Sequence, residues 1–73
     1  MNIEKKIARQ LGKRVQALRK KKGWSQEQLA VEAKVSTNYI GEIERAECNI
    51  SLHVIVWLAQ ALQIPITALF EED

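Results

Sequence analysis

The chain has 73 residues, 47% of them hydrophobic and 27% charged, which predicts one small folded domain and excludes a disordered chain. The single cysteine, Cys48, excludes an internal disulfide, and no secretory leader or membrane-length apolar run is recognised, so we expect a cytoplasmic protein without membrane insertion. The net charge of +2 is uneven, because residues up to Lys22 carry +8 and the remainder carries −6.

The first predicted helix covers Ile3 to Lys22 and is amphipathic. Its apolar residues recur every three or four positions, at Ile3, Ile7, Leu11, Val15 and Leu18. Gly23 follows three lysines and predicts the end of this helix, where positive charge suits the negative end of the helix dipole. The basic residues on its other faces are typical of a solvated helix and equally of a surface that attracts phosphates.

Two short helices are predicted next, each with a capping residue and a hydrophobic staple. One covers Gln26 to Ala33 after the N-cap Ser25, and Gln28 completes a capping box. The other covers Thr37 to Arg45 after a turn of about three residues around Lys34, with Ser36 as its N-cap. This is the geometry of a helix-turn-helix, whose second helix can enter the major groove of DNA.

The second of these two helices has two chemically different faces. Ile40 and Ile43 face inward in a helical projection, and Glu44 lies close to them. The outer face carries small and polar residues, namely Thr37, Asn38, Gly41, Glu42 and Arg45. A glycine inside a helix costs about 1 kcal/mol relative to alanine. Gly41 therefore indicates either a close approach of DNA or crowding by a neighbouring helix.

The region of about 51–70 is predicted to form two further helices that pair two copies of the chain. Ser51 caps a helix that runs to about Gln63, and Pro65 begins a short fifth helix. The core face of the longer helix is expected at Leu52, Ile55, Leu58, Ala59 and Leu62. Apolar residues in excess of one core face need a second surface to cover them. We therefore expect a homodimer interface formed by Val54, Trp57, Ala61, Ile66 and Leu69.

The motifs of these helices resemble those of one known family. The sequence Gly-Trp-Ser-Gln-Glu-Gln-Leu-Ala at Gly23–Ala30, the later Val-Ser pair and the run Ile43-Glu44-Arg45 keep the spacing of Cro/C1-type (XRE-like) helix-turn-helix regulators. The similarity extends from about Leu18 to Phe70. It implies an all-α, five-helix, lambda-repressor-like DNA-binding domain, a single unit over residues 1–73 with its helix-turn-helix at about 25–45. In size the chain is most similar to the controller proteins of restriction–modification systems.

The resemblance also implies roles for individual residues. Positions that face base edges in double-stranded DNA are matched by Thr37, Asn38 and Glu42. Positions on the DNA backbone are matched by Gln26, Ser36, Tyr39, Arg45 and Asn49. Arg19 and Glu44 match a buried ion pair, and we expect a structural role for it because an unpaired buried charge is costly. Among the base readers, Asn38 suits adenine, Thr37 suits a thymine methyl group, and Glu42 would have to accept from cytosine.

Three residues depart from the family pattern. Lys34 and Ala46 stand where the family often has glycine, and a left-handed conformation costs a non-glycine residue about 1–2 kcal/mol. We therefore expect these two turns to be shaped differently. Cys48 stands where related controllers can carry a basic residue, so we expect no phosphate contact from it.

The predicted function is a sequence-specific transcription regulator that binds an inverted-repeat operator as a homodimer, with half-sites about one helical turn, roughly 34 Å, apart. As a restriction–modification controller it would activate its own gene and the endonuclease gene, and repress both at higher occupancy. Activation requires contact with RNA polymerase, for which Glu27 and Glu32 are candidates. An antitoxin that holds a toxin against its last two helices and a stand-alone phage-type repressor are the alternatives.

No arrangement of residues indicates an enzyme. His53 and Cys48 are the only histidine and cysteine, and their spacing is not that of a metal site. Neither a phosphate-binding loop nor a nucleophile elbow is present. We therefore expect no catalysis, cofactor, metal or small-molecule ligand, and we expect His53 at the surface or at an interface.

Overall fold

The computed structural model describes residues 2–71, which form four α-helices and a 3-10 helix without any strand. In chain order the elements are α1 (Ile3–Lys21), α2 (Gln26–Ala33), α3 (Thr37–Glu44), α4 (Leu52–Leu62) and η1 (Ile66–Phe70). The predicted all-α fold is confirmed. The short fifth helix predicted after Pro65 is the 3-10 helix η1, the form that helical segments this short often adopt.

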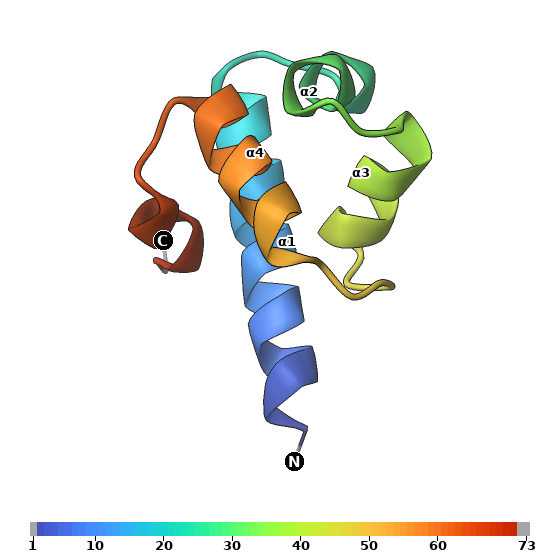
Figure 1. The fold of residues 1–73 in the computed structure, drawn as a ribbon, viewed down its shortest axis with the longest axis vertical. Helices are drawn as coiled ribbons and strands as arrows, with labels where there is room; N and C mark the ends of the chain where they lie inside the picture. The colour runs from blue at the N-terminus through green and yellow to red at the C-terminus, as the bar shows by residue number, and fades with distance from the viewer. Residues whose placement is uncertain (1, 72–73) are drawn as a thin grey trace.

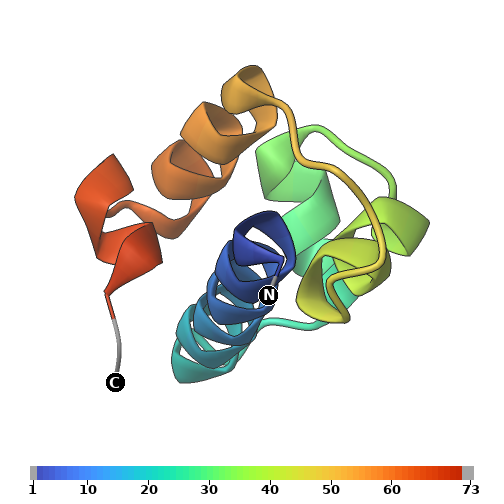
Figure 2. The same cartoon turned by 90° about the horizontal axis from the view of Figure 1, so that it is seen from below.

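α1 is the central rod of the fold (Figure 1). Figure 2 shows α4 and η1 on one side of α1 and α3 on the other, with α2 bridging α3 and α4. The first turns of α1 extend past the other elements, so Ile3 and Ile7 of the predicted apolar stripe are exposed while Leu11 and Val15 are buried. α1 therefore contacts both the helix-turn-helix and the C-terminal segment.

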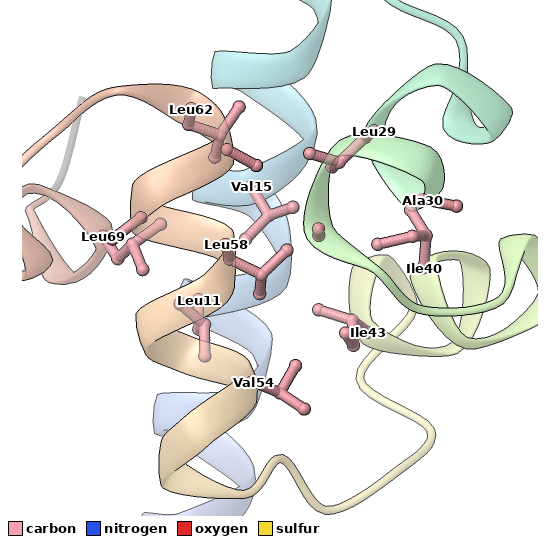
Figure 3. Packing of buried hydrophobic residues seen from close by; sticks show 13 residues of the cluster. Leu11, Val15, Leu29, Ala30, Ile40, Ile43, Val54, Leu58, Leu62 and Leu69 are labelled. Atoms are coloured by element: carbon pink, nitrogen blue, oxygen red, sulfur yellow. The ribbon is translucent and has the colours of Figure 1, made fainter.

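A single hydrophobic core joins all five elements (Figure 3). Its largest fully buried side chains are Val15 of α1, Leu29 of α2, Ile40 and Ile43 of α3, Leu58 of α4 and Leu69 of η1. Burial of one such side chain stabilises a fold by about 1.5–3 kcal/mol. Because every element contributes at least one of them, the short helices α2 and α3 are held by packing and do not depend on helix propensity alone.

Two polar side chains of α1 hold η1 in place. Gln10 Nε2 donates a hydrogen bond to the Phe70 carbonyl oxygen at 3.1 Å, and Arg14 Nε donates to the Ala68 carbonyl oxygen at 2.8 Å. An ion pair of 3.6 Å between Arg14 Nη2 and Glu71 Oε1 adds to this contact. The Gln10 side chain gives a partner to a carbonyl at the end of η1, and the Ala68 carbonyl also accepts from the Glu71 amide at 3.5 Å.

Three turns between the helices use non-glycine residues in the left-handed conformation. Lys34, Ala46 and Gln63 have φ values of 62°, 58° and 60°. In each turn the next residue's amide donates to a carbonyl oxygen five positions earlier, at 2.9–3.0 Å. These hydrogen bonds help to offset a strain of about 1–2 kcal/mol per residue. The expectation that Lys34 and Ala46 would not take up the conformation of the family glycines is therefore wrong.

The buried stripe of α4 differs from the predicted one. Its buried residues are Val54, Leu58, Ala59, Ala61 and Leu62, whereas Ile55 is half-buried. Leu52 precedes Val54 by two positions, which places it almost opposite on a helix with 3.6 residues per turn, and it is 74% exposed. The prediction that Leu52 belongs to the core is wrong. Ser51 is the N-cap residue as predicted, but its side chain makes no capping hydrogen bond.

Burial also corrects the residues expected at a dimer interface. Val54 is 4% exposed and Leu69 is 0% exposed, because both belong to the chain's own core. The prediction that they contact a second copy is therefore wrong. Ala61 is also buried and offers little surface. Trp57 is half-buried and Ile66 is exposed, so these two residues keep surface that a second copy could cover.

Candidate nucleic-acid interface

α2 and α3 start at the capping residues that the sequence predicts. Ser25 Oγ accepts a hydrogen bond from the Gln28 amide at 3.1 Å, and Gln28 Oε1 accepts one from the Ser25 amide at 2.7 Å. At α3, Ser36 Oγ accepts from the Tyr39 amide at 3.1 Å. Each capping side chain accepts from a backbone N–H group that has no partner inside the helix, and it stabilises the helix by about 1 kcal/mol. Local sequence therefore sets where α2 and α3 begin.

α3 approaches α1 closely at Gly12. A Cβ atom at this position would lie 2.5 Å from the Ile43 carbonyl oxygen and 2.9 Å from the Glu44 carbonyl oxygen. These are backbone atoms, which cannot move aside as the end of a flexible side chain can. Gly12 was not among the expected contact residues, although a glycine between the buried Leu11 and Val15 is a signal of close backbone approach.

The Arg19–Glu44 pair fixes the end of α3 to α1, as the family resemblance implies. Arg19 Nε donates to Glu44 Oε2 at 2.7 Å and Nη2 donates to Oε1 at 3.1 Å. The third nitrogen, Nη1, donates to the Trp24 carbonyl oxygen at 2.8 Å. The two side chains are only 9% and 2% exposed. The bidentate geometry compensates for the loss of water around both charges.

Gln26 shares the same carboxylate at the start of α2. Its Nε2 donates to Glu44 Oε1 at 3.1 Å, which links α2 to α3. The amide group still has a second N–H and its own oxygen. The adjacent helix N-terminus carries partial positive charge from free backbone N–H groups, an environment that favours an anion. Gln26 therefore braces α3 and is placed where it can also meet a phosphate.

The outer face of α3 presents the three predicted base-reading residues. Thr37 and Asn38 are exposed in the first turn, and Glu42 is half-buried in the next. The inner residues Ile40 and Ile43 are completely buried, so the helix cannot rotate without losing its core contacts. A rigid helix thus displays a hydroxyl, an amide and a carboxylate in a fixed order.

Gly41 makes room for an arginine and not for a neighbouring helix. A Cβ atom there would lie 2.9 Å from Arg45 Nη1, and the next nearest atoms belong to the same guanidinium group. Of the two interpretations of Gly41, crowding by another helix is therefore wrong. Arg45 Nε in turn donates to Glu47 Oε1 at 2.8 Å. Glu47 was not predicted to take part in the site, and only its nearness to Arg45 in sequence could have indicated it.

The segment after α3 packs against its outer edge. The Tyr39 hydroxyl donates to the Asn49 carbonyl oxygen at 3.3 Å, which joins two residues expected on the DNA backbone. Burial raises the pKa of the Tyr39 hydroxyl, and the nearby Cys48 and Glu42 raise it further. Burial also raises the pKa of the Cys48 thiol, with the carboxylates of Glu42 and Glu47 adding to the effect. Both groups are therefore neutral at neutral pH.

Charge is divided between the elements. The exposed basic residues of α1 are Lys5, Lys6, Arg9, Lys13, Lys20 and Lys21. From Gly23 onward the chain has two basic residues, Lys34 and Arg45, and both are exposed. α2 presents Glu27 and Glu32 to solvent. Attraction of a polyanion must therefore come mainly from α1, whereas the face of α3 carries few positive charges.

His53 lies at the surface, as expected. Its ring packs edge-on against Trp57 with a centroid distance of 4.9 Å, and its Nε2 lies 3.4 Å from Ser51 Oγ. Within residues 2–71, no three His, Cys, Asp or Glu side chains are grouped so that they could hold a metal ion. In the same range, none of the helices combines the length and the apolar character that crossing a membrane requires.

Comparison with known proteins agrees with this geometry. Residues 15–69 match the family model described as helix-turn-helix (HTH_3). The chain is 38% identical over 63 residues to the immunity repressor protein of Bacillus phage phi105 and 36% identical over 64 residues to the HTH-type transcriptional regulator SlrR of Bacillus subtilis. Each match covers 86% of this chain but only 44% and 42% of those proteins. The chain thus spans less than half the length of these curated relatives.

A solved structure of similar size also matches. The restriction-modification controller protein C.AhdI from Aeromonas hydrophila superimposes with a TM-score of 0.84 and is 41% identical in sequence. The match covers 86% of this chain and 96% of that one. The two folds therefore agree over almost the whole length of the controller protein.

Proposed function

Because the chain belongs to the helix-turn-helix (HTH_3, XRE-type) family of DNA-binding transcription regulators, we propose that it binds an inverted-repeat operator as a homodimer. The observation that carries this proposal is the fixed position of α3. Its inner face is core, its end is tied to α1 by Arg19 and Glu44, and its outer face is polar and open. A rigid helix of this kind can enter a major groove and present side chains to base edges in a constant register.

Three residues on the outer face of α3 are the proposed base readers. The Asn38 amide can pair bidentately with adenine, and the Thr37 methyl group can contact the methyl group of thymine. The Glu42 carboxylate can accept from the exocyclic amino group of cytosine. One good bidentate contact discriminates against a wrong base by about 1–3 kcal/mol. These contacts give the protein its sequence preference.

The backbone of the half-site is held by residues around these readers. The proposed contacts come from Gln26, Ser36, Tyr39 and Asn49. Gln26 stands at the N-terminus of α2 and Ser36 at that of α3, where helix dipoles favour phosphates. The bond from Tyr39 to the Asn49 carbonyl keeps the other two residues together at the edge of α3. Phosphate contacts of this kind set register and orientation, and they do not read sequence.

Two copies pair through the solvent-facing side of α4 and the start of η1. Trp57 and Ile66 remain from the interface expected from the sequence, and the exposed Leu52 joins them. All three offer apolar surface that the chain itself leaves uncovered. A two-fold dimer would place its two α3 helices in successive major grooves, with half-site centres roughly 34 Å apart.

The regulated genes are those of a restriction–modification system. The support is the 41% identity to C.AhdI across 96% of that controller protein. In this role the protein activates its own gene and the endonuclease gene at moderate occupancy, and represses them when further dimers bind. Glu27 and Glu32, both exposed on α2, are the proposed contacts with RNA polymerase.

A phage-type repressor is the second candidate function. It is favoured by the 38% identity to the immunity repressor of phage phi105, although the chain spans only 44% of that protein. The two candidates differ in the sign of regulation, since a repressor would lower transcription at every concentration.

Titration onto the DNA upstream of the protein's own gene tests the proposal. At two salt concentrations, a regulator shows a steep loss of affinity with salt together with a preference for one sequence. Binding that lacks any sequence preference would contradict the proposal. Transcription from the same DNA then separates the candidates, because a controller first raises and then lowers the transcript level as its concentration increases. The position of the gene beside a methyltransferase and an endonuclease is an independent check.

A further inference from the structure

We propose that Arg45 recognises a guanine in each operator half-site and that Glu47 is the residue that positions it. The family resemblance places Arg45 among the contacts to the DNA backbone, whereas the surroundings of its guanidinium group favour a contact with a base in the major groove. The inference rests on the proposed DNA-binding function and adds to it the identity of one base and its reader.

The first observation is the direction of the Arg45 side chain. Thr37, Gly41 and Arg45 follow one another at intervals of four residues, so they form one row along the outer face of α3. Side chains on a helix lean toward its N-terminus. Arg45 accordingly lies back over Gly41, within 2.9 Å of where a Cβ atom would stand. Its guanidinium group therefore lies over the middle of the outer face and not beyond the end of the helix.

The second observation is the contact with Glu47. Arg45 Nε donates to Glu47 Oε1 at 2.8 Å, although both side chains are 55% exposed. Exposed ion pairs contribute only about 0–1 kcal/mol to stability, so this pair matters mainly for orientation. With Nε engaged, the terminal nitrogens Nη1 and Nη2 remain as parallel donors. Such a fork matches the O6 and N7 acceptors of guanine in the major groove.

The third observation is charge. The Glu47 carboxylate neutralises Arg45 and repels phosphates, so the pair as a whole gains little from a phosphate. A base edge is neutral and keeps its attraction for the two free donors. The other outer-face groups, Thr37, Asn38 and Glu42, do not supply the bidentate donor that guanine prefers. Arg45 completes the set of readers on the face.

Selection of binding sites from a random duplex pool tests the proposal. The wild-type protein is expected to enrich a motif that includes a guanine. Arg45→Ala and Arg45→Lys are expected to lose the preference for that guanine and keep the other positions, because lysine retains the charge but not the fork. Glu47→Gln is expected to weaken the same preference without lowering the affinity for non-specific DNA. Asn49→Ala is the matched backbone control, expected to weaken all sequences alike, because the fold uses only the main-chain oxygen of this exposed residue.

Modified bases refine the test. Replacing the selected guanine with inosine keeps both acceptors and should leave the affinity unchanged. Replacing it with 7-deazaguanine removes N7, one of the two acceptors, and should weaken the wild-type protein by less than roughly 150-fold, the upper limit for a complete bidentate contact. The Arg45→Ala protein should not respond to either change.

Other outcomes would overturn the proposal. Arg45 would be a phosphate contact if Arg45→Ala weakened binding to every sequence equally and reduced the slope of log affinity against log salt concentration by about one. An unchanged guanine preference in Glu47→Gln would remove the positioning role of Glu47. A wild-type protein that enriched no motif would instead contradict the proposed function itself, so the two failures are distinguishable.

Discussion

Arg19 and Glu44 lie 25 positions apart in the sequence and meet in a bidentate ion pair, with Arg19 Nε 2.7 Å from Glu44 Oε2. The pair joins the last turn of α1 to the last residue of α3. Because both side chains are almost fully buried, the loss of one partner leaves a charge that water cannot reach.

Replacing Arg19 with alanine should therefore destabilise the protein by about 3–5 kcal/mol, the usual effect of breaking a buried pair. Chemical denaturation measures this value. The exposed Arg45–Glu47 pair provides the control, since Glu47→Ala should change the free energy of unfolding by no more than about 1 kcal/mol. Equal effects of the two substitutions would mean that the buried pair is not a structural anchor.

Gly12→Ala should destabilise the fold by about 1–3 kcal/mol, because its Cβ atom would overlap the carbonyl oxygen of Ile43. Thermal or chemical unfolding measures the change. Gly41→Ala is the matched control and should not destabilise the fold. Its methyl group meets only the mobile end of Arg45, and alanine is more favourable than glycine in a helix by about 1 kcal/mol. A Gly12→Ala protein as stable as the wild type would argue against close packing of α1 on α3.

Trp57→Glu should convert the proposed dimer into a monomer, since it places a charge in an interface formed by α4 and η1. Sedimentation measures the molecular mass at several concentrations. Val31→Glu introduces the same charge at an exposed apolar residue of α2 that is not among the proposed interface residues, and it should leave the mass unchanged. A persistent dimer in Trp57→Glu would place the contact on another face.

The double change Glu27→Gln and Glu32→Gln should abolish activation of transcription and preserve DNA affinity, if these exposed carboxylates contact RNA polymerase. In vitro transcription and a binding titration measure the two properties on the same DNA. Glu4→Gln, on the first turn of α1, is the control for a lost negative charge. Parallel loss of activation and binding would count against a polymerase contact.

Cys48 should react with an alkylating reagent only slowly at neutral pH, because burial and the carboxylates of Glu42 and Glu47 raise the pKa of its thiol. The folded state prefers the protonated thiol. The stability that this preference contributes is therefore complete below the thiol's unfolded pKa and is lost as the pH rises through the folded pKa. Glu42→Gln should shift the alkylation profile to lower pH, and Cys48→Ser supplies the background rate. The same profile for the folded and the urea-unfolded protein would rule out the pKa shift.

Sequence alone predicts the starts of α2 and α3 because their signals are local. Ser25, Gln28 and Ser36 sit within three residues of the amides that they cap. The ends of the helices were harder to predict. Lys34 and Ala46 adopt a conformation that glycine prefers, and what permits this is hydrogen bonding across the whole turn. The residue type at either position does not reveal this left-handed conformation.

The phase of α4 could not be read reliably from its sequence. The helix is apolar on most sides, so several choices of core stripe fit the pattern, and only packing against α1 and α2 selects Val54 over Leu52. The roles of Gly12 and Glu47 were likewise hidden. Each depends on a contact that forms only when α1 meets α3 or when the Arg45 side chain folds back over Gly41.

α1 touches α3 through Gly12 and Arg19 and holds η1 through Gln10 and Arg14. In the proposed dimer the surface that binds the partner and the surface that binds DNA are thus attached to one rigid rod. The distance between the two α3 helices of such a dimer would then be fixed. Operators would be selected by the number of base pairs between their half-sites, although no side chain contacts those base pairs.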